Sequence, residues 1–298
     1  MARHNSVNVI AFVQKEPLIK NGINGEEGMI ALTTIMSPRD MGKAKTGYQC
    51  NSVHFCIRSD EKRILDIVRD LKLYEIVEVN GFIATKEVNK KAECPDCGSV
   101  NFRQDSCVAH GKEKTGGNMV YIVPISLRKI EEKDNEQDAF KYLHDHRDSV
   151  NRVTVLGNLT VEPIIGELNE GRKIYTRFQV AVSRKYFTKT ASIKHRRTDY
   201  PWIYSYQRKA ELDYKTLKSG DLVLIDGALQ SRKYKEQYVC RNCGHEFDVS
   251  GRTLEILAYD TEYLRLSSFD EDEYPEFEDD EGDFYSDKKV GTNFTGII

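Results

Sequence analysis

Two cysteine motifs have the spacing of metal ligands. The first begins with Cys94 and Cys97, which are followed after nine residues by Cys107 and His110. Thiolates and an imidazole in this CxxC and CxxH arrangement are typical of a zinc ribbon. We therefore predict one structural zinc ion held by Cys94, Cys97, Cys107 and His110. Because four protein ligands leave no coordination position open, catalysis by this ion is not expected.

The second motif is a CxxC pair with no second pair behind it. Cys240 and Cys243 have only His245, two residues further on, as a nearby candidate for a third ligand. A cysteine pair that has lost its metal explains this pattern equally well. A redox-active CxxC is another alternative, although nothing around it resembles a thioredoxin-like unit. The sequence thus leaves open whether Cys240 and Cys243 hold a second zinc ion.

Four aromatic residues alternate along one short segment. Tyr200, Trp202, Tyr204 and Tyr206 are spaced two apart, so in a strand their side chains point to one face. Exposed rings can stack on unpaired bases, at about 1–3 kcal/mol per base. The alternative is that the rings fill a barrel core, but Tyr and Trp suit a small interior less well than Val or Ile. Since Ile203 can supply the core side, we predict a base-stacking face.

Basic residues surround this aromatic segment. Residues 184–197 hold six Lys or Arg side chains and no acid, and a second basic and aromatic cluster follows the next strand. A solvated surface loop is the simpler interpretation of such a run alone, but beside stacking rings it favours phosphate binding with a steep salt dependence. The predicted nucleic-acid contacts outside the aromatic segment are Arg184, Lys185, Tyr186, Lys194, Arg196, Arg197, Arg232, Lys233 and Tyr234.

The elements that must position these residues occur twice in the chain. Residues 5–9 recur at 151–155 and residues 16–19 at 162–165, and the same offset of 146 relates Cys94 to Cys240. In the second copy, β-rich runs at 153–159, 175–183, 200–206, 222–230 and 253–259 predict five strands, with a helix at 209–217. A helix at 61–71 holds the same place in the first copy. Five strands with a helix after the third is the order of an OB-type barrel.

The predicted fold is therefore mainly β, with two tandem five-stranded OB-type barrels and a CxxC knuckle between strands four and five of each. We predict a first repeat at 1–130 with a zinc ribbon at 94–110, a polar helical linker at 131–150, a second repeat at 151–268 and a disordered acidic tail at 269–298. Residues 151–268 hold 20 basic and 14 acidic side chains, whereas residues 1–150 hold 22 of each. A polyanionic partner is thus expected on the second repeat.

The second copy resembles the bacterial and phage single-stranded DNA-binding protein family. The resemblance rests on NRV at 151–153, LGNL at 156–159, FQVAV at 178–182, TDY at 198–200, LKSGDLV at 217–223 and DGALQSRKY at 226–234. It implies stacking aromatics at Tyr186, Tyr200, Tyr206 and Tyr234. It also implies binding of single-stranded DNA without strong sequence preference, in DNA replication, recombination or repair.

The same resemblance bears on partners and assembly. The family uses an acidic, aromatic tail to recruit replication and recombination proteins, which Phe277, Phe284 and Tyr285 could do here, although the chain ends in Ile297 and Ile298 rather than in acids. Four barrels per assembly in the family imply a homodimer of this two-barrel chain.

The first copy departs from the family pattern, because Asp40, His54, Asp60 and Val88 stand where the second copy has Tyr186, Tyr200, Tyr206 and Tyr234. We expect it to serve oligomerisation, partner contact or weak tracking of the nucleic-acid backbone.

Several functional classes are excluded by what the sequence lacks. It has no phosphate-binding glycine loop, no nucleophile elbow and no acid or histidine cluster outside the cysteine motifs, so an enzyme is not expected. No apolar run is long enough for a membrane span, and no signal peptide begins the chain, which predicts a cytoplasmic, nucleoid-associated protein. An RNA-binding OB-fold protein and a replisome or recombination scaffold remain as alternatives.

Overall fold

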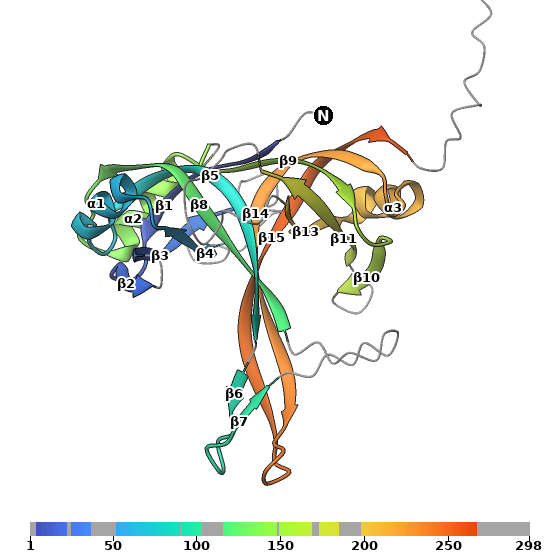
Figure 1. Ribbon diagram of the computed structural model, residues 1–298. Helices are drawn as coiled ribbons and strands as arrows, with labels where there is room; N and C mark the ends of the chain where they lie inside the picture. Colours follow the sequence, from blue (N-terminus) through green and yellow to red (C-terminus); the bar gives the residue numbers. More distant parts are fainter. Residues whose placement is uncertain are drawn as a thin grey trace, which may run out of the picture. The chain divides into compact units, whose positions relative to one another are not determined.

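The computed structural model describes residues 4–22, 25–36, 52–89, 91–102, 116–147, 149–168, 173–184 and 198–266. Strands make up most of these residues, with three helices among them (Figure 1). No helix in these ranges is both long and apolar enough to cross a membrane. The mainly β fold predicted from the sequence is thus confirmed. The predicted tail, residues 269–298, lies outside the described residues.

The first repeat closes on itself through five strands. Strand β1 pairs with β3 and β5, β3 with β4, β4 in parallel with β8, and β8 with β5. The predicted helix after the third strand is present as α1, which buries Ile64, Leu65 and Val68. The elements are β1 (Asn5–Val13), β2 (Leu18–Gly22), β3 (Gly25–Ile35), β4 (Ser52–Ser59), α1 (Lys62–Asp70), β5 (Ile76–Asn89), β6 (Lys91–Glu93), β7 (Val100–Phe102) and β8 (Gly116–Glu131).

The second repeat closes in the same order. Strand β9 pairs with β11 and β14, β11 with β13, β13 in parallel with β15, and β15 with β14. The predicted third strand at 200–206 is interrupted at Pro201, which has no N–H to donate. The elements are β9 (Asn151–Leu159), β10 (Ile164–Leu168), β11 (Lys173–Ser183), β12 (Thr198–Asp199), β13 (Trp202–Tyr206), α3 (Gln207–Thr216), β14 (Leu222–Val239) and β15 (Glu246–Arg265).

The predicted linker is a helix that packs on the first barrel. Helix α2 (Glu136–Asp145) begins at Asn135, whose side chain accepts a hydrogen bond from the Asp138 N–H. Its Ala139, Phe140 and Leu143 are buried in a cluster that includes Phe12. The linker is thus amphipathic, with its polar residues on the outer side.

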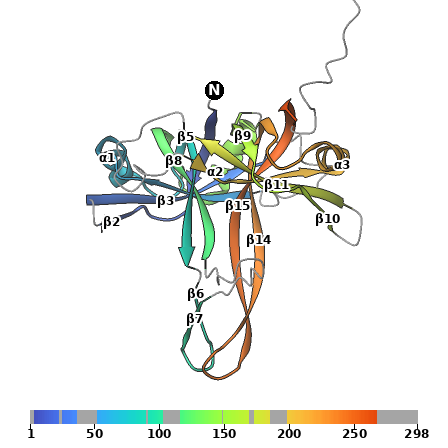
Figure 2. The same cartoon turned by 45° about the vertical axis from the view of Figure 1, so that its right-hand side comes forward.

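Strands four and five of both repeats run well beyond their barrels. Strand β14 continues to Val239, whereas the sequence predicted an end near residue 230. We call residues 85–89, 91–102 and 116–120 the first hairpin and residues 231–253 the second hairpin. Figures 1 and 2 show the two hairpins leaving the barrels in the same direction and running side by side.

Each long strand bends at a glycine where it leaves its barrel. The pairing shifts register between Asn80 and Gly81 and again between Asp226 and Gly227. A Cβ atom at Gly227 would lie 2.0 Å from the Leu257 carbonyl oxygen, and one at Gly81 would lie 2.3 Å from the Val123 carbonyl oxygen. Glycine therefore permits the close backbone contact that the bulge needs.

The two repeats are joined by antiparallel pairing of β1 with β9. Val7 lies opposite Val153, and Asn5 lies opposite Val155. Exchanging the two repeats by the offset of 146 turns the second pair into Asn151 opposite Val9, which is also present. The pairing is thus an internal two-fold arrangement centred on Val7 and Val153. Both valines are fully buried, and a single core cluster extends through both barrels.

Two buried asparagines repeat the same contact on either side of this junction. The Asn5 side chain bonds the backbone N–H and carbonyl of Ile83 at 2.9 and 3.0 Å. Asn151 makes the equivalent pair of bonds to Leu229, both at 2.9 Å. Each asparagine thus satisfies a backbone N–H and a backbone carbonyl inside the core.

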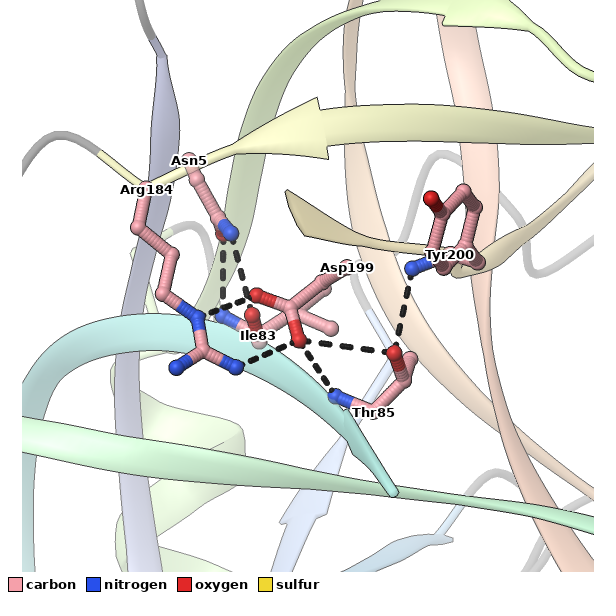
Figure 3. Close-up of polar contacts among 6 residues, drawn as sticks. All are labelled: Asn5, Ile83, Thr85, Arg184, Asp199 and Tyr200. Carbon is pink, nitrogen blue, oxygen red and sulfur yellow. Dashed lines mark hydrogen bonds and ion pairs between the residues drawn. The ribbon is translucent and has the colours of Figure 1, made fainter. Parts of the chain in front are cut away.

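A buried ion pair breaks this symmetry and adds a contact between the repeats that has no counterpart in the other half. Asp199 accepts two bonds from Arg184, at 2.5 and 2.7 Å, and one from the Thr85 N–H of the first repeat at 2.7 Å (Figure 3). The Tyr200 N–H donates to the Thr85 hydroxyl at 3.1 Å. Val53 stands at the position equivalent to Asp199, so no carboxylate occupies the matching place in the first repeat.

We predict that Asp199→Ala lowers the free energy of unfolding by about 3–5 kcal/mol, because it leaves the Arg184 guanidinium buried without its carboxylate. Glu78→Ala is the matched control, since Glu78 is half-buried but its partner Arg128 is exposed, so losing this pair should cost less than about 1 kcal/mol. Urea denaturation measures both. Equal losses in the two variants would show that the buried pair has no special role.

Candidate nucleic-acid interface

The aromatic residues of β13 project from the outer face of the second barrel. Ile203 points into the core, whereas Trp202, Tyr204 and Tyr206 lie outside the core cluster. Trp202 and Tyr206 are half-buried, and Tyr204 is almost fully buried. The face predicted from the two-residue spacing is therefore formed by three of the four aromatics.

Tyr200 lies outside β13, beyond the break at Pro201. It is exposed, and its backbone carbonyl accepts a hydrogen bond from the Gln179 side chain at 3.2 Å. Because its N–H also donates to Thr85, its backbone is fixed at the border with the first repeat.

Strand β11 supplies neighbours that the sequence analysis missed. Tyr175 lies opposite Tyr206, and Arg177 opposite Tyr204. The Lys173 ammonium lies 4.1 Å from the centre of the Tyr206 ring, and the Arg177 guanidinium 5.2 Å from that of Trp202. Neither cation forms an ion pair with any described residue. The alternation of Lys173, Tyr175 and Arg177 was the signal that could have identified them.

Tyr204 forms the buried centre of this face. Its ring stacks on Tyr175 at 5.8 Å between centroids, and its hydroxyl accepts a bond from Arg232 at 3.2 Å. Arg232 also pairs with the buried Glu255 at 2.8 Å. Burial raises the pKa of the Tyr204 hydroxyl, so the group stays neutral. Tyr204 thus holds its neighbours in place beneath the surface.

Tyr234 extends the face onto the second hairpin. It lies opposite Gly251, and a Cβ at Gly251 would lie 2.4 Å from the Tyr234 ring. The ring therefore rests on the bare backbone of the neighbouring strand. The remaining predicted contacts, Lys185, Tyr186, Lys194, Arg196 and Arg197, lie outside the described residues, and Arg184 is committed to the buried pair with Asp199.

The first repeat carries a different set of side chains on the equivalent face. Cys56 stands where Trp202 does and Arg58 where Tyr204 does. In the neighbouring strand the register of the pairing puts Glu27 at the position of Tyr175, and Gly25 and Met29 at those of Lys173 and Arg177. Arg58 and Glu27 neutralise each other in an ion pair of 2.7 Å. This face therefore lacks both the stacked rings and the unpaired cations of the second barrel.

The second hairpin presents a cationic side to the first repeat. Ser231 accepts a hydrogen bond from the His54 N–H at 3.2 Å, and Lys233, Lys235 and Arg252 follow on the same side of the two-stranded ribbon. All three cations are exposed, and none forms an ion pair with a described residue. Burial, together with the charges of Arg252 and Lys233, lowers the pKa of His54 to about 4. We call Lys233, Lys235 and Arg252 the cationic side.

The hairpins bring the two CxxC pairs together. The sulfur atoms of Cys94, Cys97, Cys240 and Cys243 all lie within 4.8 Å of one another. Cys94 Sγ is 3.7 Å from Cys243 Sγ, and Cys97 Sγ is 3.5 Å from Cys240 Sγ. A tetrahedron with metal–sulfur bonds of about 2.3 Å has edges of about 3.8 Å, which matches these contacts.

This cluster brings together two cysteine pairs that the sequence analysis treated as separate sites. Cys240 and Cys243 complete a four-thiol group with Cys94 and Cys97, so the second pair is neither an isolated knuckle nor dependent on His245. The predicted ligands Cys107 and His110 lie outside the described residues. Local spacing favoured them because they follow the first pair closely, whereas the partners found in space are more than 140 residues away in the chain.

Local hydrogen bonds favour the thiolate form of one cysteine. Bonds with the side chain and backbone of Ser99 lower the pKa of Cys97 to about 6. Metal ions bind thiolates rather than thiols, so the surroundings of Cys97 suit a metal ligand, whereas desolvation and hydrogen bonds with the neighbouring thiols raise the pKa of Cys243 to about 12.

Comparisons with known proteins bear on the family and on the fold. The Single-strand binding protein family matches residues 150–250. Single-stranded DNA-binding protein 2 of Chlorobaculum tepidum is 30% identical over 134 residues, which cover 44% of this chain and 83% of that protein. Single-stranded DNA-binding protein A of Bacillus subtilis is 33% identical over 88 residues, 30% of this chain and 49% of that protein.

The fold comparison extends over both repeats. The crystal structure of the wild-type single-stranded DNA binding protein from Thermus aquaticus matches with a TM-score of 0.53 and 16% identity, covering 90% of this chain and 97% of that one.

Closed five-stranded barrels with an aromatic and cationic outer face define a binding protein of the OB-fold class. The chain belongs to the single-strand binding protein family, and it is a binding protein, not an enzyme. The family resemblance inferred from the sequence is confirmed.

We predict that His54 titrates near pH 4 and that Arg252→Ala raises its pKa toward 6.5, because one of the nearby positive charges is removed. Since the unfolded chain binds this proton first, the free energy of unfolding should fall as the pH drops from 6.5 to about 4. Nuclear magnetic resonance of the imidazole measures the pKa. An unchanged value in Arg252→Ala would place Arg252 away from this ring.

Proposed function

We propose that this chain binds single-stranded DNA on the outer face of its second barrel, with little preference for sequence. The observation that carries the proposal is the set of half-buried rings on β13 beside the unpaired cations Lys173 and Arg177. Membership of the single-strand binding protein family supports DNA as the ligand.

Bases stack on the rings, and cations neutralise the phosphates. Trp202 and Tyr206 offer ring surface at the two ends of β13, and Tyr200 and Tyr234 extend the surface on either side. Because every base has a flat π-face, stacking tolerates any sequence. The buried Tyr204 and its bond to Arg232 restrict movement of the surface, so less ordering entropy is lost on binding.

We predict that Trp202→Ala combined with Tyr206→Ala weakens binding to oligo-dT at least tenfold, since two stacking surfaces worth about 1–3 kcal/mol each are removed. Cys56→Ala, at the position equivalent to Trp202 in the first repeat, should leave affinity unchanged. Fluorescence anisotropy of labelled oligo-dT measures both, with circular dichroism to verify folding. Retained affinity in a folded double variant would contradict the stacking surface.

The four-cysteine cluster is proposed to hold one structural zinc ion. Four thiolates at tetrahedral spacing are the ligand set that zinc prefers in structural sites. Cys94 and Cys240 are buried while Cys97 and Cys243 are exposed. All four coordination positions would be filled by protein, so the ion would stabilise the hairpins rather than react.

We predict one zinc ion per chain, lost in Cys240→Ser and retained in the combined variant Cys107→Ser, His110→Ala. The shared cluster needs Cys240, whereas the ligand set inferred from local spacing needs Cys107 and His110, so the two alternatives give opposite results. Elemental analysis of the purified variants decides between them. If Cys240→Ser keeps its zinc and the other variant loses it, the result would instead support the zinc ribbon of Cys94, Cys97, Cys107 and His110.

Recruitment of replication and recombination proteins through Phe277, Phe284 and Tyr285 stays a prediction from the sequence, as does a homodimer with four barrels.

A further inference from the structure

We propose that the four-cysteine cluster and the cationic side of the second hairpin act together: a metal ion bound by both hairpins holds Lys233, Lys235 and Arg252 against the first repeat, where they bind phosphates of the single strand. This inference rests on the proposed function, and it assigns the first repeat a part in DNA binding.

The cluster ties together two segments that otherwise share a few polar contacts near their tips, such as the bond from the Arg241 N–H to the Asn101 side chain at 3.0 Å and the contact of His245 with Asp96 at 3.0 Å. Each hairpin is a two-stranded ribbon beyond its barrel, and such ribbons are marginal on their own in water. Each repeat contributes two of the four sulfurs, and two sulfur pairs at 3.7 and 3.5 Å join different repeats. The metal site is therefore incomplete in either repeat alone, and an ion there links the hairpins far from the β1–β9 junction.

The cationic side has the properties of a phosphate site. Lys233 lies opposite Arg252 and Lys235 opposite Ser250, so three positive charges are adjacent on one ribbon. Lys233, Lys235, Ser250 and Arg252 line an open pocket of about 460 Å³ together with Tyr234 and Gly251. The next pair toward the tip, Gln237 and Asp248, ends the run of cations.

The first repeat lies beside the base of the second hairpin, next to the pocket rather than lining it. The bond from the His54 N–H to Ser231 places β4 beside the base of the second hairpin. The His54 ring bonds Thr33, Gln14 and Ser52 at 3.0–3.2 Å, so this part of the first repeat is polar and carries no acid at that point. The pKa of His54, lowered by burial and by Arg252 and Lys233, agrees with this arrangement.

The first hairpin has no equivalent of the cationic side. Glu87 and Asn89 stand at the positions equivalent to Lys233 and Lys235, and Asn118, the strand partner of Glu87, stands where Arg252 does. At these positions the cationic side is therefore a feature of the second hairpin and not of the first.

The test compares metal-loaded protein with protein freed of metal by a chelator under reducing conditions. Both are titrated with oligo-dT of about 8 nucleotides, which fits one barrel, and of about 30 nucleotides, which reaches the hairpin. We expect metal removal to weaken binding of the long oligonucleotide at least tenfold. The slope of log affinity against log salt concentration should become shallower by about 2, the value for three phosphates on a single strand. Binding of the short one should stay unchanged.

Lys235→Ala with Arg252→Ala provides a test that keeps all cysteines. In metal-loaded protein this variant should lose affinity for the long oligonucleotide only, and metal removal should then have little further effect. Lys215→Ala with Lys218→Ala removes two exposed cations at the end of α3 and serves as the control.

The outcomes separate the two proposals. Failure to bind the short oligonucleotide would overturn the proposed function. This inference alone would be overturned if the short oligonucleotide binds normally while neither metal removal nor the hairpin substitutions change the affinity or the salt slope of the long one. Protein that binds no metal would also overturn it.

Discussion

The antiparallel pairing of β1 with β9 is the interaction on which the rest of the structure depends. Its register, with Val7 opposite Val153, orients one barrel relative to the other and makes their cores continuous. Because the two repeats are related about this point, their long strands leave on the same side and their hairpins meet. A slip by one residue would turn buried valines outward and separate the cysteine pairs. The four-cysteine cluster and the border at Tyr200 both follow from this one register.

The candidate DNA surface combines this framework with local electrostatics. Rings at the surface of β13 rest on a buried layer of Tyr204, Tyr175 and Arg232, and the charge of Arg232 is balanced by Glu255. Lys173 and Arg177, which form no ion pair with a described residue, lie over the rings rather than away from them. The charge of Arg232 is therefore neutralised by a carboxylate beneath the surface, whereas the charges of Lys173 and Arg177 lie beside the rings that a ligand would contact.

The sequence predicts what is local and repeated. The offset of 146, the strand alternation and the helix after the third strand were sufficient for the barrels, and the spacing of Trp202 to Tyr206 was sufficient for their common face. The hairpins were missed because residues 231–239 are mostly charged and polar, without the apolar alternation of a half-buried strand. The pairing of Cys94 with Cys243 could not be predicted, because it depends on how two distant hairpins meet.

The internal two-fold arrangement also determines which substitutions the two repeats can acquire independently. A homodimer of identical barrels must carry every substitution twice, so an acid introduced at one border would appear at both. Covalent linkage of the two halves removes this restriction. Asp199 could arise opposite Thr85 while its counterpart stayed Val53, and one barrel could keep its aromatic rings while the other lost them. Duplication within one chain thus permits a division of labour that symmetric assembly of identical subunits forbids.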